Sequence, residues 1–374
     1  MTPMALLLEE SRAISTGSKS VARNSGLRHT KPALAGKMEP NEKTPPVAED
    51  AKVPTFPEIP FTRALVVDPT AEDGQAKQVP QAIAHRGYKA MYPENTMSAF
   101  KAAVKVGAHA IETDIHLSKD GVVVLSHIDQ DGTLKRCFGV DKKEPMPRLS
   151  ELLEYLAMPE AGHLWLFLDV KRDDDPEELL SLTRRTIDHA ETAVRKDNGQ
   201  AKPWKDRIVV GGWSEDYISL ITKMFPGFGA ALIGFSVKYA RQFFEVPNLG
   251  FNMLQKILVG PIGSRFIKDV RAADRPLFLW TVNDEEWMDW SINKKVDGVI
   301  TDDPKLFLEV CKRATDGDFE GPGGHYGSRG RRQVPLRRKA KLYAQIAWAQ
   351  ILIFVMSWYF FASLKKQHGR KVDK

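Results

Sequence analysis

Strand-like and helix-like segments alternate along the middle of this chain, and this alternation narrows the possible folds more than any other feature. Short runs rich in β-branched and aromatic residues recur between residues 81 and 313. The predicted strands are Ala82–Arg86, Ala110–Asp114, Leu164–Val170, Arg207–Trp213, Ala231–Ser236, Phe251–Leu254, Leu277–Val282 and Gly298–Thr301. Helical patterns between them include Asn95–Val106, Pro176–Ala193, Glu215–Met224 and Asp284–Ile292. Eight such units predict a (β/α)8 TIM barrel, an α/β fold, rather than an open sheet.

One segment interrupts the alternation. Gly121–His127 follows Ile115–Leu117 after only three residues, which is too short a gap for a parallel crossover. We therefore predict a β-hairpin with Asp120 and Gly121 in its turn. The hairpin would return His127 to the carboxyl end of the barrel strands, where barrel enzymes have their active sites.

The two ends of the chain differ from its middle. Residues 1–79 are rich in Pro, Ala, Ser, Lys and Glu without sustained periodicity, so we expect a disordered N-terminal arm before a barrel domain over residues 80–315. A basic Gly/Arg-rich linker is expected over residues 316–341. Residues 342–364 contain no charged side chain, and a run of that length can cross roughly 30 Å of hydrocarbon as a helix. A buried amphipathic helix is the alternative to a transmembrane tail anchor.

Charge is concentrated at the C-terminus. Residues 329–374 contain 12 Lys or Arg and one acid, a net charge of +11 against +6 for the whole chain, so the rest carries −5. An acidic body argues against nucleic-acid binding, and basic flanks around the apolar run, including the tail at residues 365–374, suit anionic lipid headgroups. Cys137 and Cys311 have no metal-ligand spacing and are expected to be reduced, which favours a body facing the cytosol.

Carboxylates stand at the ends of two predicted strands. Glu112 and Asp114 are two residues apart, so their side chains point to the same side of one strand. Two such carboxylates resist burial as anions unless a cation lies between them. Asp169, near the end of the next barrel strand, can supply a third ligand. Oxygen ligands without Cys or a close His pair favour a hard divalent ion, Mg²⁺ or Ca²⁺. Each carboxylate alone could instead be a capping or loop residue.

Basic residues and histidines accompany these carboxylates. Arg86 offers a planar fork for phosphate oxygens, and Lys171 shares a face with Asp169. His85 and His127 are expected at strand ends that converge, where one imidazole can remove a proton from a nucleophile while the other protonates a leaving oxygen. The set predicts metal-assisted phosphate ester chemistry. Structural ion pairs and core histidines are the simpler alternatives.

Two further residues are candidates for substrate or phosphate contact. Glu94 precedes Asn95 and Thr96, which could cap the next helix, and the alternative for Glu94 is a first-turn helix acid. Trp280 lies near the end of the strand Leu277–Val282 and could form an apolar wall of the pocket.

Residues 81–313 resemble the glycerophosphodiester phosphodiesterase family, and the resemblance rests on an ordered set of motifs. These are His85-Arg86-Gly87, Pro93-Glu94-Asn95-Thr96, Glu112-x-Asp114, Asp120-Gly121 before the strand that ends at His127, Asp169-Val170-Lys171, Leu279-Trp280-Thr281-Val282-Asn283 and Gly298-Val299-Ile300-Thr301-Asp302-Asp303-Pro304. With the apolar C-terminal run, the chain looks most similar to the fungal phosphatidylglycerol phospholipase C branch.

The resemblance implies roles for the candidate residues. His85 and His127 would be the general acid/base pair, and Glu112, Asp114 and Asp169 would bind Mg²⁺ or Ca²⁺. Arg86 and Lys171 would hold the phosphate, and Glu94 would support His85 or the metal shell. Asp169 stands where the family often has Glu, one methylene longer. The loop after His127 is expanded by a few residues, which leaves substrate access open.

The expected function is a membrane-anchored phosphodiesterase that hydrolyses phosphatidylglycerol to diacylglycerol and glycerol 3-phosphate. Two alternatives remain open at this point: a glycerophosphodiester phosphodiesterase or lysophospholipase D acting on other glycerophosphodiesters, and a non-catalytic lipid-binding barrel tethered to a membrane. We expect a single C-terminal anchor with a cytosol-facing catalytic domain on the endoplasmic reticulum, lipid droplets or the mitochondrial outer membrane.

Overall fold

Eight parallel strands close into a barrel in the computed structural model, which describes residues 55–68, 77–127, 144–197 and 202–316, with short pieces between residues 320 and 351. The barrel strands are β3 (Gln81–His85), β4 (Ala110–Leu117), β6 (Trp165–Val170), β7 (Ile208–Gly212), β8 (Gly229–Gly234), β9 (Gly250–Leu254), β10 (Leu277–Trp280) and β11 (Gly298–Thr301). Each pairs with the next in this order, and β11 pairs with β3 to close the ring. The predicted TIM barrel is confirmed.

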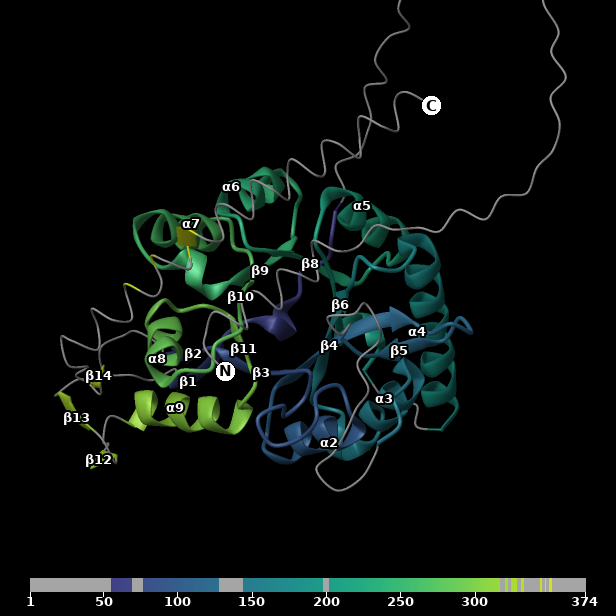
Figure 1. The fold of residues 1–374 in the computed structure, drawn as a ribbon, viewed down its shortest axis with the longest axis horizontal. Coiled ribbons are helices and arrows are strands. Elements are labelled where there is room, and N and C mark those ends of the chain that lie inside the picture. Colours follow the sequence, from purple (N-terminus) through teal and green to yellow (C-terminus); the bar gives the residue numbers. More distant parts are fainter. Residues whose placement is uncertain are drawn as a thin grey trace, which may run out of the picture.

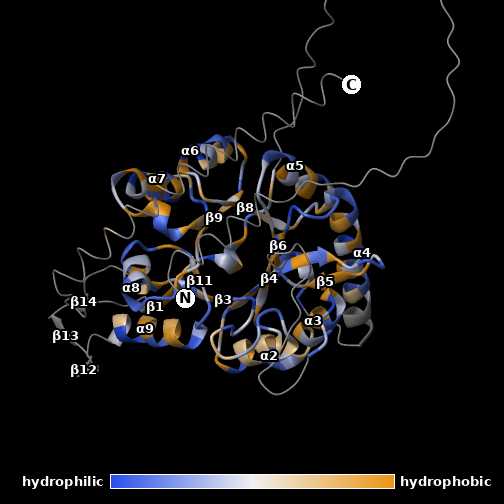
Figure 2. Cartoon of the chain, viewed as in Figure 1, coloured by the Kyte–Doolittle hydropathy of each residue, from blue (hydrophilic) through white to orange (hydrophobic). Residues whose placement is uncertain are grey.

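Helices surround the barrel, as the view in Figure 1 shows. They are α2 (Met97–Lys105), α3 (Leu149–Leu156), α4 (Pro176–Asp197), α5 (Glu215–Met224), α6 (Val237–Ala240), α7 (Pro261–Ala272), α8 (Glu285–Asn293) and α9 (Pro304–Asp316). Short 3-10 turns are η1 (Pro60–Thr62), η2 (Pro159–Ala161), η3 (Trp204–Asp206), η4 (Arg241–Glu245) and η5 (Gln255–Leu258). The longer helices are amphipathic and place their apolar stripes toward the strands (Figure 2).

Aromatic side chains fill the inside of the barrel. The ring centroid of Phe278 lies 5.9 Å from that of Phe167 and 5.7 Å from that of Trp165. Gly211 makes room for this packing, because a Cβ there would lie 2.6 Å from the Phe167 ring. The interior is therefore a packed core rather than a pore, and it supports the strand ends from below.

The predicted hairpin is also confirmed. Strand β5 (Val123–Leu125) runs antiparallel to the outer part of β4, with Ile115 opposite Leu125. Gly121 supplies the left-handed conformation of the turn, with φ of 75°. The Ser126 amide donates a hydrogen bond to the Asp114 carbonyl at 3.2 Å, so the returning chain meets the barrel strand beside its carboxylates.

Part of the N-terminal arm is ordered, so the expectation of disorder up to residue 79 is wrong for residues 55–68 and 77–79. Strands β1 (Leu65–Asp68) and β2 (Lys77–Val79) form an antiparallel pair. Phe56 and Ile59 are each 3% exposed, and Ile59 packs with the barrel interior at the amino ends of the strands. The interior needs an apolar cover at this end, and Ile59 supplies it together with Phe61, whose ring centroid lies 5.8 Å from that of Trp165. Residues 1–54 lie outside the described part of the chain.

The C-terminal predictions concern residues that are mostly outside the described part. Short strands β12 (Glu320–Gly321), β13 (Gly324–Gly327) and β14 (Arg331–Arg332) lie within the expected linker. Among the described residues, none of the helices has both the length and the apolar character needed to cross a membrane. Residues 344, 347, 350 and 351 are the described positions of the uncharged run, so the predicted anchor over residues 342–364 stays a prediction.

Replacement of Ile59 tests the role of the ordered arm as a barrel cover. We expect Ile59→Ala to lower the free energy of unfolding by about 2–5 kcal/mol, because it removes buried methyl groups and leaves a cavity. Val66→Ala is the matched control, since Val66 is 53% exposed, and its cost should stay within about 0.5 kcal/mol. Urea unfolding measures both. Equal stability of the two variants would contradict a covering role.

Candidate active site

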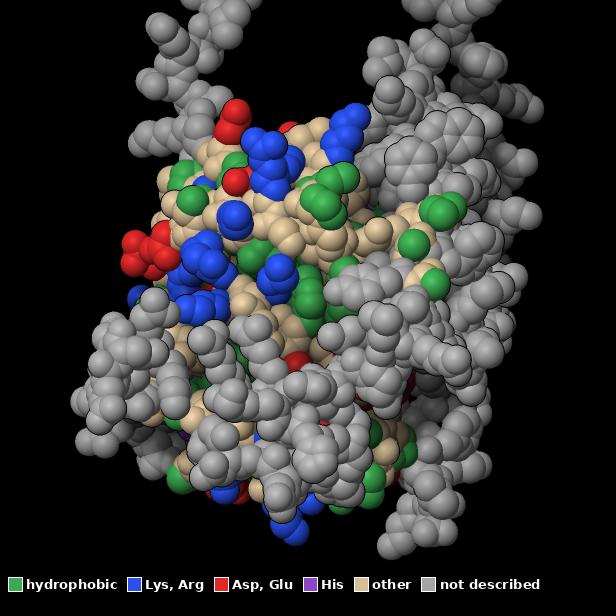
Figure 3. Space-filling view, turned by 90° about the vertical axis from the view of Figure 1, so that its left-hand side faces the viewer, with side chains coloured by type: hydrophobic (Ala, Val, Ile, Leu, Met, Phe, Trp, Pro, Cys, Tyr) green, Lys and Arg blue, Asp and Glu red, His purple; other side chains and the backbone are tan. Residues whose placement is uncertain are grey.

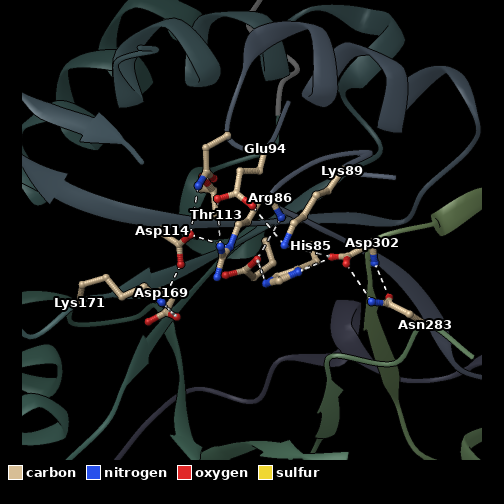
Figure 4. A network of polar contacts seen from close by, with 12 residues as sticks. His85, Arg86, Lys89, Glu94, Thr113, Asp114, Asp169, Lys171, Asn283 and Asp302 are labelled. Carbon is tan, nitrogen blue, oxygen red and sulfur yellow. Dashed lines mark hydrogen bonds and ion pairs between the residues drawn. The ribbon is translucent and has the colours of Figure 1, made fainter. Parts of the chain in front are cut away.

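Polar side chains converge at the carboxyl ends of β3, β4 and β6 (Figure 4). The strand register explains why they meet. His85 is paired with Glu112 across β3 and β4, and Asp114 is paired with Asp169 across β4 and β6. A residue at the end of each parallel strand thus faces the same mouth of the barrel, as the sequence analysis predicted.

Three of these residues form a carboxylate cluster. Oxygen atoms of Glu112, Asp114 and Asp169 all lie within 4.8 Å of one another, and the three side chains are buried. Burial, followed by the charges of Asp114 and Asp169, raises the pKa of Glu112 well above its ordinary value. A divalent cation among these oxygens would offset both the burial and the repulsion that raise this pKa. The donor set therefore fits the predicted metal site.

Two cations already balance the negative charge of Asp114, one member of the cluster. Asp114 lies 2.9 Å from Arg86 Nε and 2.7 Å from Lys171 Nζ. Burial alone would raise the pKa of Asp114, but these two cations outweigh burial and hold it well below its ordinary value. Lys171 Nζ also lies 2.5 Å from Asp169, so this lysine joins two of the three carboxylates. Both predicted phosphate-holding residues are therefore in place beside the metal candidates.

Asn95 holds the same carboxylate from the other side, a role that the sequence analysis did not assign. Its Nδ2 donates to Asp114 at 3.0 Å, and its Oδ1 accepts from Thr113 at 2.7 Å. Asn95 has a left-handed backbone with φ of 54°, which Asn tolerates better than most residues. The next residue, Thr96, caps α2 by accepting from the Ala99 amide, as its position before that helix suggested.

Glu94 pairs with two cations of the site. Its carboxylate lies 3.2 Å from Arg86 Nη1 and 3.1 Å from Lys89 Nζ. Arg86 is thus held between Glu94 and Asp114 with its side chain only 7% exposed. Such a paired guanidinium keeps a fixed orientation, which suits a group that must meet a phosphate at one position.

His85 is oriented by Asp302, a residue that stood in a recognised motif but received no role from sequence. Nδ1 of His85 and Oδ1 of Asp302 are 2.6 Å apart, while Nε2 lies 3.9 Å from Glu112. Asn283 donates to the other Asp302 oxygen at 2.8 Å. Burial alone would raise the pKa of Asp302, but His85 and Lys89 lower it to about 2. Because a carboxylate only accepts, Nδ1–H donates, and Nε2 is left to accept a proton.

His127 is the second predicted imidazole, and it lies just after β5. Burial, followed by the charge of Arg86, lowers its pKa well below the ordinary value, and Asp114 opposes that shift. Burial and Arg86 lower the pKa of His85 as well. The two rings are thus subject to the same guanidinium from separate strand ends. The expanded loop after His127 extends into residues 128–143, which lie outside the described part.

Aromatic rings flank the carboxylate cluster. Trp213, at the end of β7, donates from Nε1 to Asp169 at 2.7 Å, and Lys171 Nζ lies 5.6 Å from its ring centroid. Trp280 packs edge-on against Trp213, with centroids 5.7 Å apart. The expected apolar wall at Trp280 therefore includes Trp213, which sequence reasoning missed. The available signal was the position of Trp213 at a strand end, because a buried indole N–H needs a hydrogen-bond acceptor.

The comparisons with known proteins agree with this geometry. The glycerophosphoryl diester phosphodiesterase family model matches residues 85–306. A glycerophosphodiester phosphodiesterase of Caldanaerobacter subterraneus is 24% identical over 259 residues, covering 62% of this chain and 97% of that protein. Human lysophospholipase D GDPD1 is 45% identical over 74 residues, which are 20% of this chain and 23% of that protein.

Solved structures share the fold. A phosphodiesterase from Oleispira antarctica, in complex with the product sn-glycerol-3-phosphate, has a TM-score of 0.51 at 21% identity and covers 63% of this chain and 97% of its own. A glycerophosphodiester phosphodiesterase from Parabacteroides distasonis has a TM-score of 0.50 at 21% identity, covering 63% and 98%.

This chain belongs to the glycerophosphoryl diester phosphodiesterase family. It is a phosphoric diester hydrolase, and enzymes of the family depend on a divalent metal; Glu112, Asp114 and Asp169 form an acidic cluster that could hold such an ion.

Removal of one carboxylate charge should separate metal binding from stability. We expect Glu112→Gln to leave the metal-free melting temperature unchanged or higher, because it relieves repulsion in the cluster. The same variant should lose the rise in melting temperature that Mg²⁺ or Ca²⁺ gives the wild type. Glu154→Gln, at an exposed position on α3, should behave as the wild type. A full metal-induced rise in Glu112→Gln would place the ion elsewhere.

Asp302→Asn tests how His85 is oriented. We expect kcat to fall on the order of 10²-fold with little change in KM, because the amide can donate to Nδ1 and so favours the wrong tautomer of His85. Asp284→Asn is the control, since Asp284 is exposed and its side chain makes no capping bond to α8. Steady-state kinetics with chelator-treated and metal-loaded enzyme measures both. A kcat within threefold of wild type would show that His85 does not need this carboxylate.

Proposed function

We propose that this chain is a membrane-associated, metal-dependent phospholipase C that hydrolyses phosphatidylglycerol to diacylglycerol and glycerol 3-phosphate. Three buried carboxylates converge with Arg86, Lys171 and two imidazoles at the barrel mouth. This observation is the main support for the phosphodiester chemistry. The lipid substrate is supported by the uncharged run over residues 342–364 between basic flanks.

The metal would be held by Glu112, Asp114 and Asp169. Held there, Mg²⁺ or Ca²⁺ would supply Lewis-acid polarisation of a phosphoryl oxygen and neutralise part of its charge. Arg86 and Lys171 extend the same function, since each is a buried cation fixed by a carboxylate of the cluster. Their fixed positions mean that little reorganisation is needed when the phosphodiester arrives.

The imidazoles divide the proton transfers. His85 presents Nε2 as an acceptor because Asp302 takes its Nδ1–H. We assign it to remove the proton of the 2-hydroxyl of the headgroup glycerol. That oxygen attacks phosphorus, the bond from phosphorus to the diacylglycerol oxygen breaks, and His127 protonates the departing oxygen. Water then opens the cyclic phosphate and yields glycerol 3-phosphate.

The charges around His127 affect its role as a proton donor. In the site without substrate, burial and Arg86 keep its pKa low. The negative charge of a bound phosphodiester opposes both effects and favours the protonated ring that donation requires. Asp114, which already raises the pKa of His127, acts in the same direction.

A lysophospholipase D or glycerophosphodiester activity is the second candidate, and the local similarity to the human lysophospholipase D favours it. The matched segment covers only 20% of this chain, and a membrane anchor over the uncharged run would bring the enzyme to a membrane lipid rather than to a soluble glycerophosphodiester. The complete set of acid, base and metal-ligand candidates gives no support to a non-catalytic barrel. We propose a cytosol-facing catalytic domain at an anionic membrane.

The 2-hydroxyl of the headgroup glycerol provides a test of this mechanism. We expect phosphatidylglycerol to be cleaved at least about 10³-fold faster than an analogue whose headgroup lacks the 2-hydroxyl, because attack by a positioned neighbouring group then becomes impossible. Phosphatidylglycerol and analogue vesicles are compared at matched lipid concentration. Rapid cleavage of the analogue would exclude the cyclic route, and faster cleavage of lysophosphatidylcholine than of phosphatidylglycerol would favour the second candidate.

A further inference from the structure

Apolar side chains project from two loops at the mouth of the barrel. Met91 and Tyr92 are 69% and 42% exposed in the loop between β3 and α2, and Ile262 is 73% exposed in the first turn of α7. Both positions follow a barrel strand, so both lie at the end where the carboxylate cluster opens. Residues of this size are usually covered, and exposure at the rim of a site points to an interaction surface.

Positive charge lies near Ile262, one of these exposed apolar residues. Residues 237–272, which include α6 and α7, contain six Lys or Arg and two Asp or Glu. Lys238 and Arg265 are exposed, and Lys256 lies in η5, directly after β9. Figure 3 looks at the side of the barrel that carries α7 and α8, and Lys and Arg side chains gather in the upper part of that view beside apolar ones. This basic sector suits an anionic surface.

The opposite side of the mouth has the reverse charge. Residues 173–178, which lead from β6 into the first turn of α4, contain five Asp or Glu and no Lys or Arg. An anionic surface would repel this sector while it attracts the basic one. The charge pattern therefore favours a tilted contact, close to α6 and α7 and farther from α4.

The uncharged C-terminal run meets the basic sector. Gln350 donates two hydrogen bonds from Nε2, to the carbonyls of Lys256 at 2.8 Å and Val259 at 2.9 Å. These carbonyls belong to the segment that precedes Ile262, and the neighbouring Ile351 is 56% exposed. One residue of the uncharged run thus contacts the segment that precedes the exposed Ile262.

We propose that the mouth of the barrel rests on the surface of an anionic bilayer through Met91, Tyr92 and Ile262, with the basic sector of α6 and α7 against the headgroups. This inference rests on the proposed lipid substrate. It gives the barrel a membrane contact of its own, separate from the anchor. A lipid phosphodiester then needs to rise only a short way from the bilayer to reach the carboxylate cluster.

Serine substitutions on the rim test this contact through catalysis. In the full-length protein, we expect Met91→Ser/Ile262→Ser to lower kcat/KM on phosphatidylglycerol vesicles on the order of tenfold, because less apolar surface enters the bilayer. Turnover of soluble glycerophosphoglycerol should stay within twofold. Met158→Ser is the matched control, since Met158 is 46% exposed between α3 and β6, at the opposite end of the barrel. Wild-type vesicle activity in the rim variant, or an equal loss in the control, would overturn the proposal.

A fluorescence measurement tests the contact without turnover. An environment-sensitive fluorophore is attached to Ile262→Cys or Met158→Cys in a full-length Cys137→Ser background. Burial raises the pKa of Cys311 to about 12, so this thiol stays unlabelled. We expect a blue shift at position 262 with phosphatidylglycerol vesicles, a smaller one with phosphatidylcholine, and none at position 158. No shift at position 262 would overturn the contact. A shift without phosphatidylglycerol hydrolysis would leave the contact standing and refute the proposed substrate.

Discussion

Mutual repulsion among three buried carboxylates is the constraint on which the arrangement of this site depends. Glu112, Asp114 and Asp169 cannot all stay ionised in so small a volume without positive charge beside them. Arg86 and Lys171 supply part of that charge, but burial, together with the charges of Asp114 and Asp169, still raises the pKa of Glu112. A divalent cation would supply the positive charge that is still missing. Once bound, the cation would also attract an anionic phosphodiester. The metal and the substrate would thus both bind through the charge balance of the same carboxylate cluster.

The barrel makes this balance possible because it fixes the groups from several strands at once. Carboxylates come from β4 and β6, the oriented imidazole from β3, and its carboxylate partner from the segment after β11. Packed aromatic rings inside the barrel hold these strand ends apart at constant spacing. The ordered piece of the N-terminal arm, with Ile59 against the same interior, protects that packing at the far end. Stability is therefore concentrated at the amino ends of the strands, while strained and charged residues such as Arg86, with φ of 57°, occupy the carboxyl ends.

Local sequence patterns were sufficient for the barrel, the hairpin and the charged cluster, because each depends on short-range periodicity or spacing. Glu112 and Asp114 share a face for that reason, and the three-residue gap before Gly121 permits only a turn. The contacts that sequence reasoning missed join distant parts of the chain. Asp302 lies 217 residues from His85, and Trp213 lies 44 residues from Asp169. Ile59 and Phe61 were assigned to a disordered arm because isolated apolar residues have no period, and only the closed barrel reveals the surface that they cover.

Product analysis on phosphatidylglycerol vesicles tests the central claim most directly. Full-length protein is incubated with the vesicles in Mg²⁺ or Ca²⁺, or with chelator, and the products are identified by mass spectrometry. We expect diacylglycerol and glycerol 3-phosphate in equal amounts, formed only with metal present. Phosphatidic acid and glycerol would mean that the opposite side of the phosphorus is cut, and hydrolysis that survives complete metal removal would contradict the role given to the three carboxylates.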